Sequence, residues 1–228
     1  MWWDVDTSLR NREIVLAGGS GGLGSVTAQL LEAGGARVIV SSRSSGVTAD
    51  ITNAADRARL LNAAPELYGL VVFTGNPARG PAQEMMRLSN ELNYEGPILL
   101  AREAAERMKT RGTPGAIVLF STMQAIGLFP GSTVYAGAKA ALLHTARILA
   151  KEYRGPANIR VNVIAPGVMN AGMAKASIAS GKYQRYIDEG IVARYGRAED
   201  IAGAVRFFLE PDNYITGQVL TVDAGLTL

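Results

Sequence analysis

The first residues that could do chemistry are a tyrosine and a lysine in the stretch VYAGAK. Tyr135 and Lys139 are four positions apart with only small residues between them, and residues at this spacing share one face of a helix. A free phenol has a pKa of about 10, and a cation within about 4–6 Å lowers that value. The pair could therefore transfer a proton near neutral pH, although a solvated tyrosine beside a solvated lysine is the simpler interpretation.

A glycine string is the second feature that could do chemistry. In VLAGGSGGLGSVTAQLL, Gly18, Gly22 and Gly24 follow the pattern G-x-x-x-G-x-G. Glycines let a backbone approach a pyrophosphate closely, and the N-terminus of the next helix offers free N–H groups and a partial positive charge. Such a string alone could be an ordinary turn, but its place between a strand and a helix favours dinucleotide binding.

Short apolar runs alternate with helical patterns along the whole chain, and these elements must position the candidate residues. The alternation predicts a parallel sheet covered on both faces, and strands buried on both sides are typically continuous runs of Val, Ile and Leu. We therefore predict an α/β fold, with residues 1–228 forming a single Rossmann-type domain around a doubly wound parallel sheet. The expected strands are residues 12–19, 36–42, 68–75, 115–122, 159–167 and 217–225, and the expected helices are 25–35, 54–64, 99–112, 135–153 and 198–210. Residues 172–190 break this rhythm, and we expect them to form an insertion above the sheet.

The composition excludes several classes of protein. A chain of 228 residues with 48% hydrophobic and 19% charged residues is typical of one soluble domain. Cysteine is absent, so we expect no disulfide or thiol metal site, and a reducing compartment such as the cytoplasm. We expect no signal peptide, because the first residues lack a basic stretch followed by an apolar run. We expect no membrane span, because the uncharged residues 112–138 are interrupted by Gly, Pro, Ser and Thr. A net charge of only +3, carried by scattered basic residues, argues against nucleic-acid binding. A single histidine argues against a metal site.

Several motifs, in order, resemble the short-chain dehydrogenase/reductase family, whose glycine turn reads T-G-x-x-x-G-x-G. TADIT resembles its D-x-T segment, ELNYEGPILLA its N-x-x-G helix, STMQAIGLFPGSTVYAGAK its S…Y-x-x-x-K active site, and IRVNVIAPGVMNAGM its P-G segment. The resemblance extends from Ser8 to Leu228 and is nearest to 3-oxoacyl-carrier-protein reductases. It implies a cytoplasmic oxidoreductase that assembles as a homo-oligomer, either a dimer or a tetramer.

The resemblance assigns roles to individual residues. Tyr135 becomes the proton donor in reduction, Lys139 lowers its pKa and binds the nicotinamide ribose, and Asn93 holds a water that relays protons. Family spacing back from Tyr135 indicates Thr122 as the hydroxyl that binds the carbonyl. Neighbours on a strand point to opposite faces, so we expect only one of the two hydroxyls to reach the site, with Ser121 as the alternative if the strand end bulges. The residues implied to bind the cofactor are Gly18, Ser20, Gly21, Gly22, Leu23, Gly24, Ser42, Arg43, Asp50, Ile51, Thr74, Gly75, Tyr135, Lys139, Pro166, Gly167 and Val168.

The residues after the second expected strand indicate which dinucleotide would bind. NAD enzymes of the Rossmann type place an acidic residue there, but no Asp or Glu occurs between Gly34 and Ala49. Ser42 occupies the corresponding position, and Arg43 follows it. A guanidinium can pair with a 2′-phosphate, although a solvated loop arginine is the alternative. We therefore expect NADP(H), with NAD(H) less favoured.

Three departures from the family pattern leave a second function open. Ala17 replaces a threonine, residues 72–75 read VFTG where the family has N-N-A-G, and Ala171 replaces a threonine near the carboxamide. These losses suggest a non-catalytic NADP-binding or regulatory protein. Retention of the Asn–Tyr–Lys set instead favours an NADP(H)-dependent oxidoreductase that reduces a small-molecule ketone or aldehyde, a 3-oxoacyl thioester or similar compound, to an alcohol. The expected pocket walls are Met123, Gln124, Phe129 and Met173.

Overall fold

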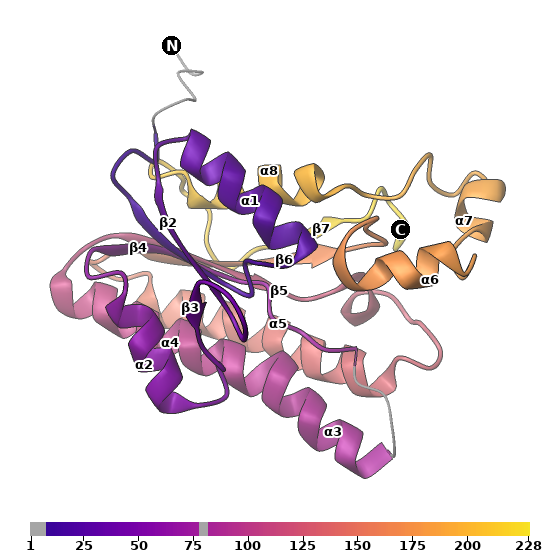
Figure 1. Cartoon of the computed structure of the whole chain (residues 1–228), viewed down its shortest axis with the longest axis horizontal. Helices are drawn as coiled ribbons and strands as arrows, with labels where there is room; N and C mark the ends of the chain where they lie inside the picture. Colours follow the sequence, from indigo (N-terminus) through magenta and orange to yellow (C-terminus); the bar gives the residue numbers. More distant parts are fainter. Residues whose placement is uncertain (1–7, 78–81) are drawn as a thin grey trace.

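The centre of the molecule is a sheet of seven parallel strands. The structure is a computed structural model that describes residues 8–77 and 82–228. The strands pair in the order β3-β2-β1-β4-β5-β6-β7, and every pairing is parallel. Helices cover both faces of the sheet (Figure 1). The predicted Rossmann-type α/β fold is confirmed.

Burial explains why the central strands are continuous apolar runs. Strands β1, β4 and β5 are buried at every position, whereas β2, β3 and β7 lie toward the edges and are partly exposed. A strand covered on both faces needs apolar residues at every position, not at alternate ones. The bounds are β1 (Glu13–Ala17), β2 (Arg37–Ser42), β3 (Val47–Thr48), β4 (Leu67–Val72), β5 (Gly115–Phe120), β6 (Ile159–Pro166) and β7 (Val219–Val222).

Two layers of helices close two hydrophobic clusters against the sheet (Figure 1). On one face, Leu31 and Ile201 are fully buried in the same cluster, and on the other Leu100 and Leu142 are. The first layer holds α1 (Gly22–Ala33) and α8 (Ala198–Leu209); the second holds α2 (Ala54–Asn62), α4 (Gly96–Arg111) and α5 (Thr133–Tyr153). Within the described residues, no helix is long and apolar enough to cross a membrane.

Several short elements lie outside the predicted pattern. Helix α3 (Ala82–Asn90) runs into α4 through a π-helical turn, η1 (Glu91–Glu95). A short 3-10 turn, η2 (Met123–Ala125), follows β5. Residues 172–190 contain η3 (Gly172–Ala174), α6 (Lys175–Ala179) and α7 (Arg185–Asp188), which lie beyond the end of β6 (Figure 1).

The order of the strands sets where a ligand can bind. Ala17, the last residue of β1, pairs with Ser41 of β2 on one side and Val72 of β4 on the other. After β1 the chain adds β2 and β3 on one side, and it then adds β4 to β7 on the other side. Ligands of open α/β sheets bind in the crevice outside the carboxyl ends of the strands where the order reverses in this way.

Candidate active site

A cavity of about 510 Å³ lies along the carboxyl ends of the central strands. It is lined from the turn after β1 to the segment after β6, so it brings together residues far apart in the sequence. Every predicted site residue except Asn93 lines this cleft: Gly18, Ser20, Gly21, Gly22, Leu23, Gly24, Ser42, Arg43, Asp50, Ile51, Thr74, Gly75, Thr122, Tyr135, Lys139, Pro166, Gly167 and Val168.

The glycine turn forms a cradle that requires glycine at several of its positions. Gly18 has φ +77°, and a Cβ at Gly22 would lie 2.8 Å from the backbone nitrogen of Gly172. Helix α1 starts after Gly21 with no side-chain cap and no acidic residue in its first turn. Its N–H groups and the positive end of its dipole are therefore available to an anion. The cradle fits the pyrophosphate of a dinucleotide.

Arg43 lies at the β2 end of the cleft. The hydroxyl of Ser42 accepts hydrogen bonds from the N–H groups of Ser44 at 3.2 Å and Ser45 at 2.8 Å, which fixes the turn that carries Arg43. Arg43 is exposed and lines the cleft. Among the residues described, it has no acidic partner within salt-bridge distance. Its guanidinium can therefore pair with a ligand phosphate.

A buried arginine holds the loop of Asp50 and Ile51. Arg57, only 5% exposed, donates from Nη1 to the carbonyl oxygens of Ile51 at 2.9 Å and Thr52 at 3.2 Å. Its Nε forms an ion pair with Glu103 at 2.9 Å. The loop is thus anchored to α2 and α4. This role of Arg57 could not be predicted, because an arginine in a helical pattern is typically on the surface.

Tyr135 and Lys139 lie one turn apart on α5, as predicted, and both line the cleft. Lys139 is 2% exposed, and its Nζ donates to the carbonyl oxygens of Phe120 at 2.8 Å and Thr74 at 3.3 Å. Burial lowers the pKa of Lys139 to about 7 and raises the pKa of Tyr135 to about 12. The chain without cofactor therefore holds Tyr135 as a phenol. This direction is opposite to the lowering expected from Lys139.

Asn93 lies behind the cleft, not in its wall. It is fully buried in the π-helical turn η1, and π-turns inside helices are frequent at functional sites. Its amide donates to the carbonyl of Asn76 at 2.8 Å and to Ser89 at 3.0 Å, and accepts from the N–H of Asn76 at 2.8 Å. A Cβ at Gly75 would lie 3.2 Å from Oδ1 of Asn93 and 3.5 Å from Nζ of Lys139. Asn93 and Lys139 therefore meet at Gly75.

The two hydroxyls at the end of β5 differ in their partners. Ser121 donates to the backbone oxygen of Lys139 at 3.0 Å, which ties β5 to α5. The Thr122 hydroxyl accepts only a long hydrogen bond, from the N–H of Gln124 at 3.4 Å. Both residues line the cleft, but the Thr122 hydroxyl is the less engaged of the two.

An aromatic contact lies where the family pattern has an asparagine. The ring of Phe73 packs on that of Phe120, with centroids 4.6 Å apart. The ends of β4 and β5 are therefore joined by apolar packing instead of a side-chain amide. Next to Phe73, the hydroxyl of Thr74 is buried and has no hydrogen-bond partner among the described residues.

Some lining residues were predicted and others were not. Met123, Gln124 and Met173 line the cleft as expected, whereas Phe129 is not among the lining residues. Leu92 and Asn76 also line the cleft, but nothing in their residue types indicates a ligand. Over residues 8–77 and 82–228, no group of three or more His, Cys, Asp or Glu could hold a metal ion.

Comparison with known proteins identifies the family. Residues 47–227 match the model of a family described as Enoyl-(Acyl carrier protein) reductase, and the curated relatives match along nearly the whole chain. The chain belongs to the short-chain dehydrogenase/reductase family.

Similar members of the short-chain dehydrogenase/reductase family include two vertebrate proteins. Carbonyl reductase family member 4 of Danio rerio is 31% identical over 243 residues, which cover 96% of this chain and 99% of that protein. Dehydrogenase/reductase SDR family member 4 of Homo sapiens is 29% identical over 246 residues, covering 95% of this chain and 88% of that protein.

Solved structures of short-chain dehydrogenases/reductases superimpose closely. A short chain dehydrogenase/reductase family protein has a TM-score of 0.86 at 28% identity and covers 97% of this chain and 100% of its own. ElxO with NADP bound has a TM-score of 0.85 at 23% identity and covers 95% of this chain and 98% of its own. At that identity the likeness to ElxO concerns the fold alone.

Proposed function

We propose that this short-chain dehydrogenase/reductase is an NADP(H)-dependent carbonyl reductase. It reduces a ketone or aldehyde, a 3-oxoacyl thioester or a similar compound, to the alcohol. The observation that carries the proposal is a single cleft with a glycine cradle at one end and Tyr135 beside buried Lys139 at the other. The likeness to carbonyl reductase family member 4 of Danio rerio supports it.

The residues of the cleft divide between the parts of the cofactor. The turn from Gly18 to Gly24 would hold the pyrophosphate, and Arg43 would pair with the 2′-phosphate. Asp50 and Ile51 would flank the adenine, and the backbone of Val168 would bind the carboxamide. When bound, the reduced nicotinamide supplies a hydride to the carbonyl carbon.

The proton comes from the protein. Tyr135, held as a phenol by burial, donates its proton to the carbonyl oxygen, which Thr122 also binds through its hydroxyl. Lys139 in its protonated form stabilises the phenolate that remains. Asn93 and a water connect the pair to solvent. The carbonyl thus gains one hydride and one proton, which completes the reduction.

The activity test is NADPH oxidation against a panel of ketones and 3-oxoacyl thioesters. Removing the hydroxyl in Tyr135→Phe removes the proton donor, and general acids contribute about 10²- to 10⁴-fold to a rate. We expect the variant to lose at least about 100-fold in kcat while still binding NADPH. Wild-type protein that binds NADPH but turns over no better than this variant would support the non-catalytic alternative.

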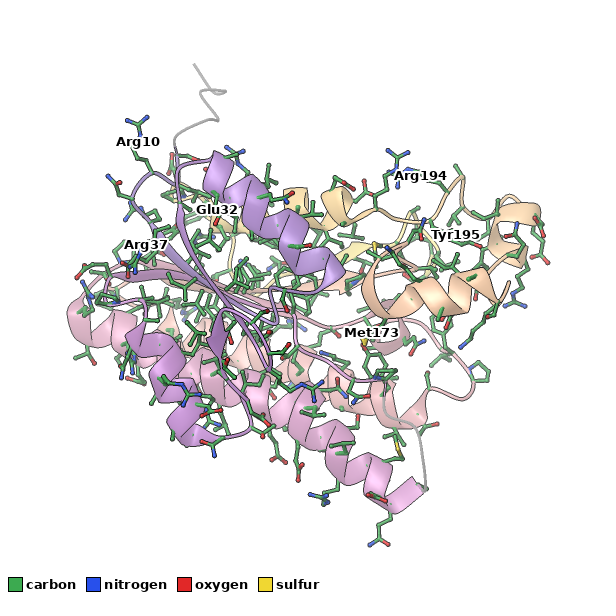
Figure 2. All side chains as sticks on the ribbon, viewed as in Figure 1. Arg10, Glu32, Arg37, Met173, Arg194 and Tyr195 are labelled. Atoms are coloured by element: carbon green, nitrogen blue, oxygen red, sulfur yellow. The ribbon has the colours of Figure 1, made fainter. Side chains whose placement is uncertain are left out.

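The preference for NADP(H) is tested at Arg43. Arg43→Ala should weaken NADPH binding by about tenfold or more, because hydrogen bonds to charged groups contribute about 1.5–3 kcal/mol, and should leave NADH binding nearly unchanged. Arg10→Ala removes an exposed arginine that does not line the cleft (Figure 2) and is the matched control. Calorimetric titration gives both affinities; equal losses for NADPH and NADH at Arg43→Ala would refute the contact with the 2′-phosphate.

The assembly and the compartment complete the proposal. Leu99 of α4 and Ile148 of α5 are 43% and 45% exposed, and apolar side chains on an outer helix face suit contact with a second copy of the chain. We propose a dimer or tetramer, which sedimentation would show, located in the cytoplasm.

A further inference from the structure

We propose, as a consequence of the function proposed above, that the carbonyl substrate is uncharged and apolar around the reacting carbon. Compounds that carry a carboxylate or phosphate close to the carbonyl group would be excluded. The arrangement of charged and apolar side chains along the cleft carries this inference.

Charged side chains are scarce in the cleft. Among the described lining residues, only Arg43, Asp50 and Lys139 are charged. Arg43 and Asp50 follow β2 and β3, which places them at the end proposed for the adenine. Lys139 already donates to two carbonyl oxygens and is 2% exposed. No described side chain at the β5–β6 end is therefore available to pair with a substrate anion.

Apolar side chains form the wall at that same end. Met123 is 3% exposed, and Met123, Leu92, Met173 and Ala174 all line the cleft. Methionine fits apolar groups of irregular shape because its side chain is flexible. Gln124 and Tyr183 also line the cleft, and their polar side chains are uncharged. Such a wall would bind an apolar chain and leave an anion without a partner, which is unfavourable.

Exposed apolar side chains lie at or near this end of the cleft. Met173 of η3 lines the cleft and is 59% exposed. Ile126 and Leu128 follow the lining residue Gln124 by two and four positions and are 44% and 99% exposed. Exposed apolar groups beside a cleft are a sign of a binding surface for apolar ligands.

The described cations of the segment after the apolar wall do not line the cleft. Lys175, Lys182 and Arg185 are exposed and are not among the lining residues; Lys182 and Arg185 each lie over a tyrosine ring, 5.4 and 5.1 Å from its centre. Asp188 and Glu189 lie in the same exposed segment and offset part of this positive charge. Exposed charges are screened by salt, so these residues would not compensate an anion bound beside Tyr135.

A matched pair of substrates tests the inference. Ethyl acetoacetate and acetoacetate share the same ketone, but only the second carries a carboxylate. We expect kcat/KM for the ester to exceed that for the anion by at least about 100-fold, because a buried charge without a partner is strongly disfavoured. Equal values, or a preference for acetoacetate, would overturn the inference while leaving carbonyl reduction intact.

A charge placed in the wall gives the converse test. Met173→Arg should raise kcat/KM for acetoacetate about fivefold, as expected of a partly exposed ion pair, and lower it for the ester. Met86→Arg adds the same charge to α3 at a residue that is 55% exposed and does not line the cleft, and should leave the ratio unchanged. An unchanged ratio in Met173→Arg would contradict the proposed wall. NADPH binding without turnover of either compound, or of any ketone in the panel, would contradict the proposed function itself.

Discussion

At the scale of single residues, burial determines what Tyr135 and Lys139 can do. Their spacing on one helix face follows from the sequence, and a chance surface pair has the same spacing. The structure differs from such a pair because burial raises the pKa of Tyr135 to about 12 and lowers that of Lys139 to about 7. Tyr135 is thus a proton donor at every pH of interest, and Lys139 is the group that titrates near neutrality.

The pH dependence of reduction follows from these directions. Lys139 is a cation below its pKa of about 7 and loses its charge above it, whereas Tyr135 keeps its proton throughout. We expect kcat/KM to be level below this pH and to fall about tenfold per unit above it. The profile is measured on initial rates of NADPH oxidation.

The conservative variant distinguishes a role for the charge from a role in packing. Lys139→Arg keeps a positive charge to high pH, so its profile should be flat even if its rate is lower. A wild-type rate that rises on passing through neutral pH would contradict the requirement for a protonated Lys139.

Family spacing could select Thr122 over Ser121, but the physical reason comes from the structure. Ser121 is committed to the backbone of Lys139, while Thr122 accepts one long hydrogen bond. Such partners depend on how β5 meets α5, which no local pattern encodes. For the same reason the burial of Asn93 behind Gly75 could not be predicted, although its identity as a site residue could be proposed.

At the scale of elements, an ion pair between buried Arg57 and partly exposed Glu103 links α2 and α4 to the loop proposed for the adenine. Arg57 holds the carbonyl oxygens of Ile51 and Thr52 and pairs with Glu103. Arg57 is not itself a lining residue of the cleft, so we regard it as a positioning residue for the cofactor.

Truncating this side chain should loosen one end of the cleft only. Arg57→Met should weaken binding of adenosine 2′,5′-bisphosphate about tenfold, since hydrogen bonds to charged groups contribute about 1.5–3 kcal/mol, and leave nicotinamide mononucleotide unaffected. Arg102→Met, in which an exposed arginine of α4 and its ion pair with Glu152 are lost, is the matched control. Calorimetry with the two fragments, on protein shown to be folded by circular dichroism, makes the measurement. An equal loss for both fragments would indicate general destabilisation and not positioning.

The long elements could be predicted from the sequence and the short ones could not. Continuous apolar runs indicated β1, β4, β5 and β6 because burial on both faces leaves a strong pattern. Strand β3 has two residues and exists through its pairing with β2, so it leaves no periodicity. The π-helical turn η1 differs from an α-helix by one residue in its hydrogen-bond register, a change that residue types do not reveal.

At the scale of the whole molecule, the strand order brings the site together. The turn after β1, the ends of β4 and β5 and the segment after β6 meet because parallel strands end at one edge of the sheet. Alternation of strands and helices was sufficient to predict the parallel sheet, whereas the residues of the site were predicted from their motifs. The close approach of Gly22 to Gly172 joins the start of α1 to the segment after β6, and only the folded chain shows it.

The central claim is that the cleft binds NADPH and a carbonyl compound together. The nicotinamide then supplies a hydride to the carbonyl carbon while Tyr135 supplies the proton. The most direct measurement is the mass of the alcohol formed from ethyl acetoacetate with NADPH deuterated at nicotinamide C4 on the transferred face. The account predicts an alcohol that carries one deuterium on the former carbonyl carbon, formed by the wild-type chain and at least about 100-fold more slowly by Tyr135→Phe. Alcohol without deuterium, or equal rates for the two proteins, would contradict it.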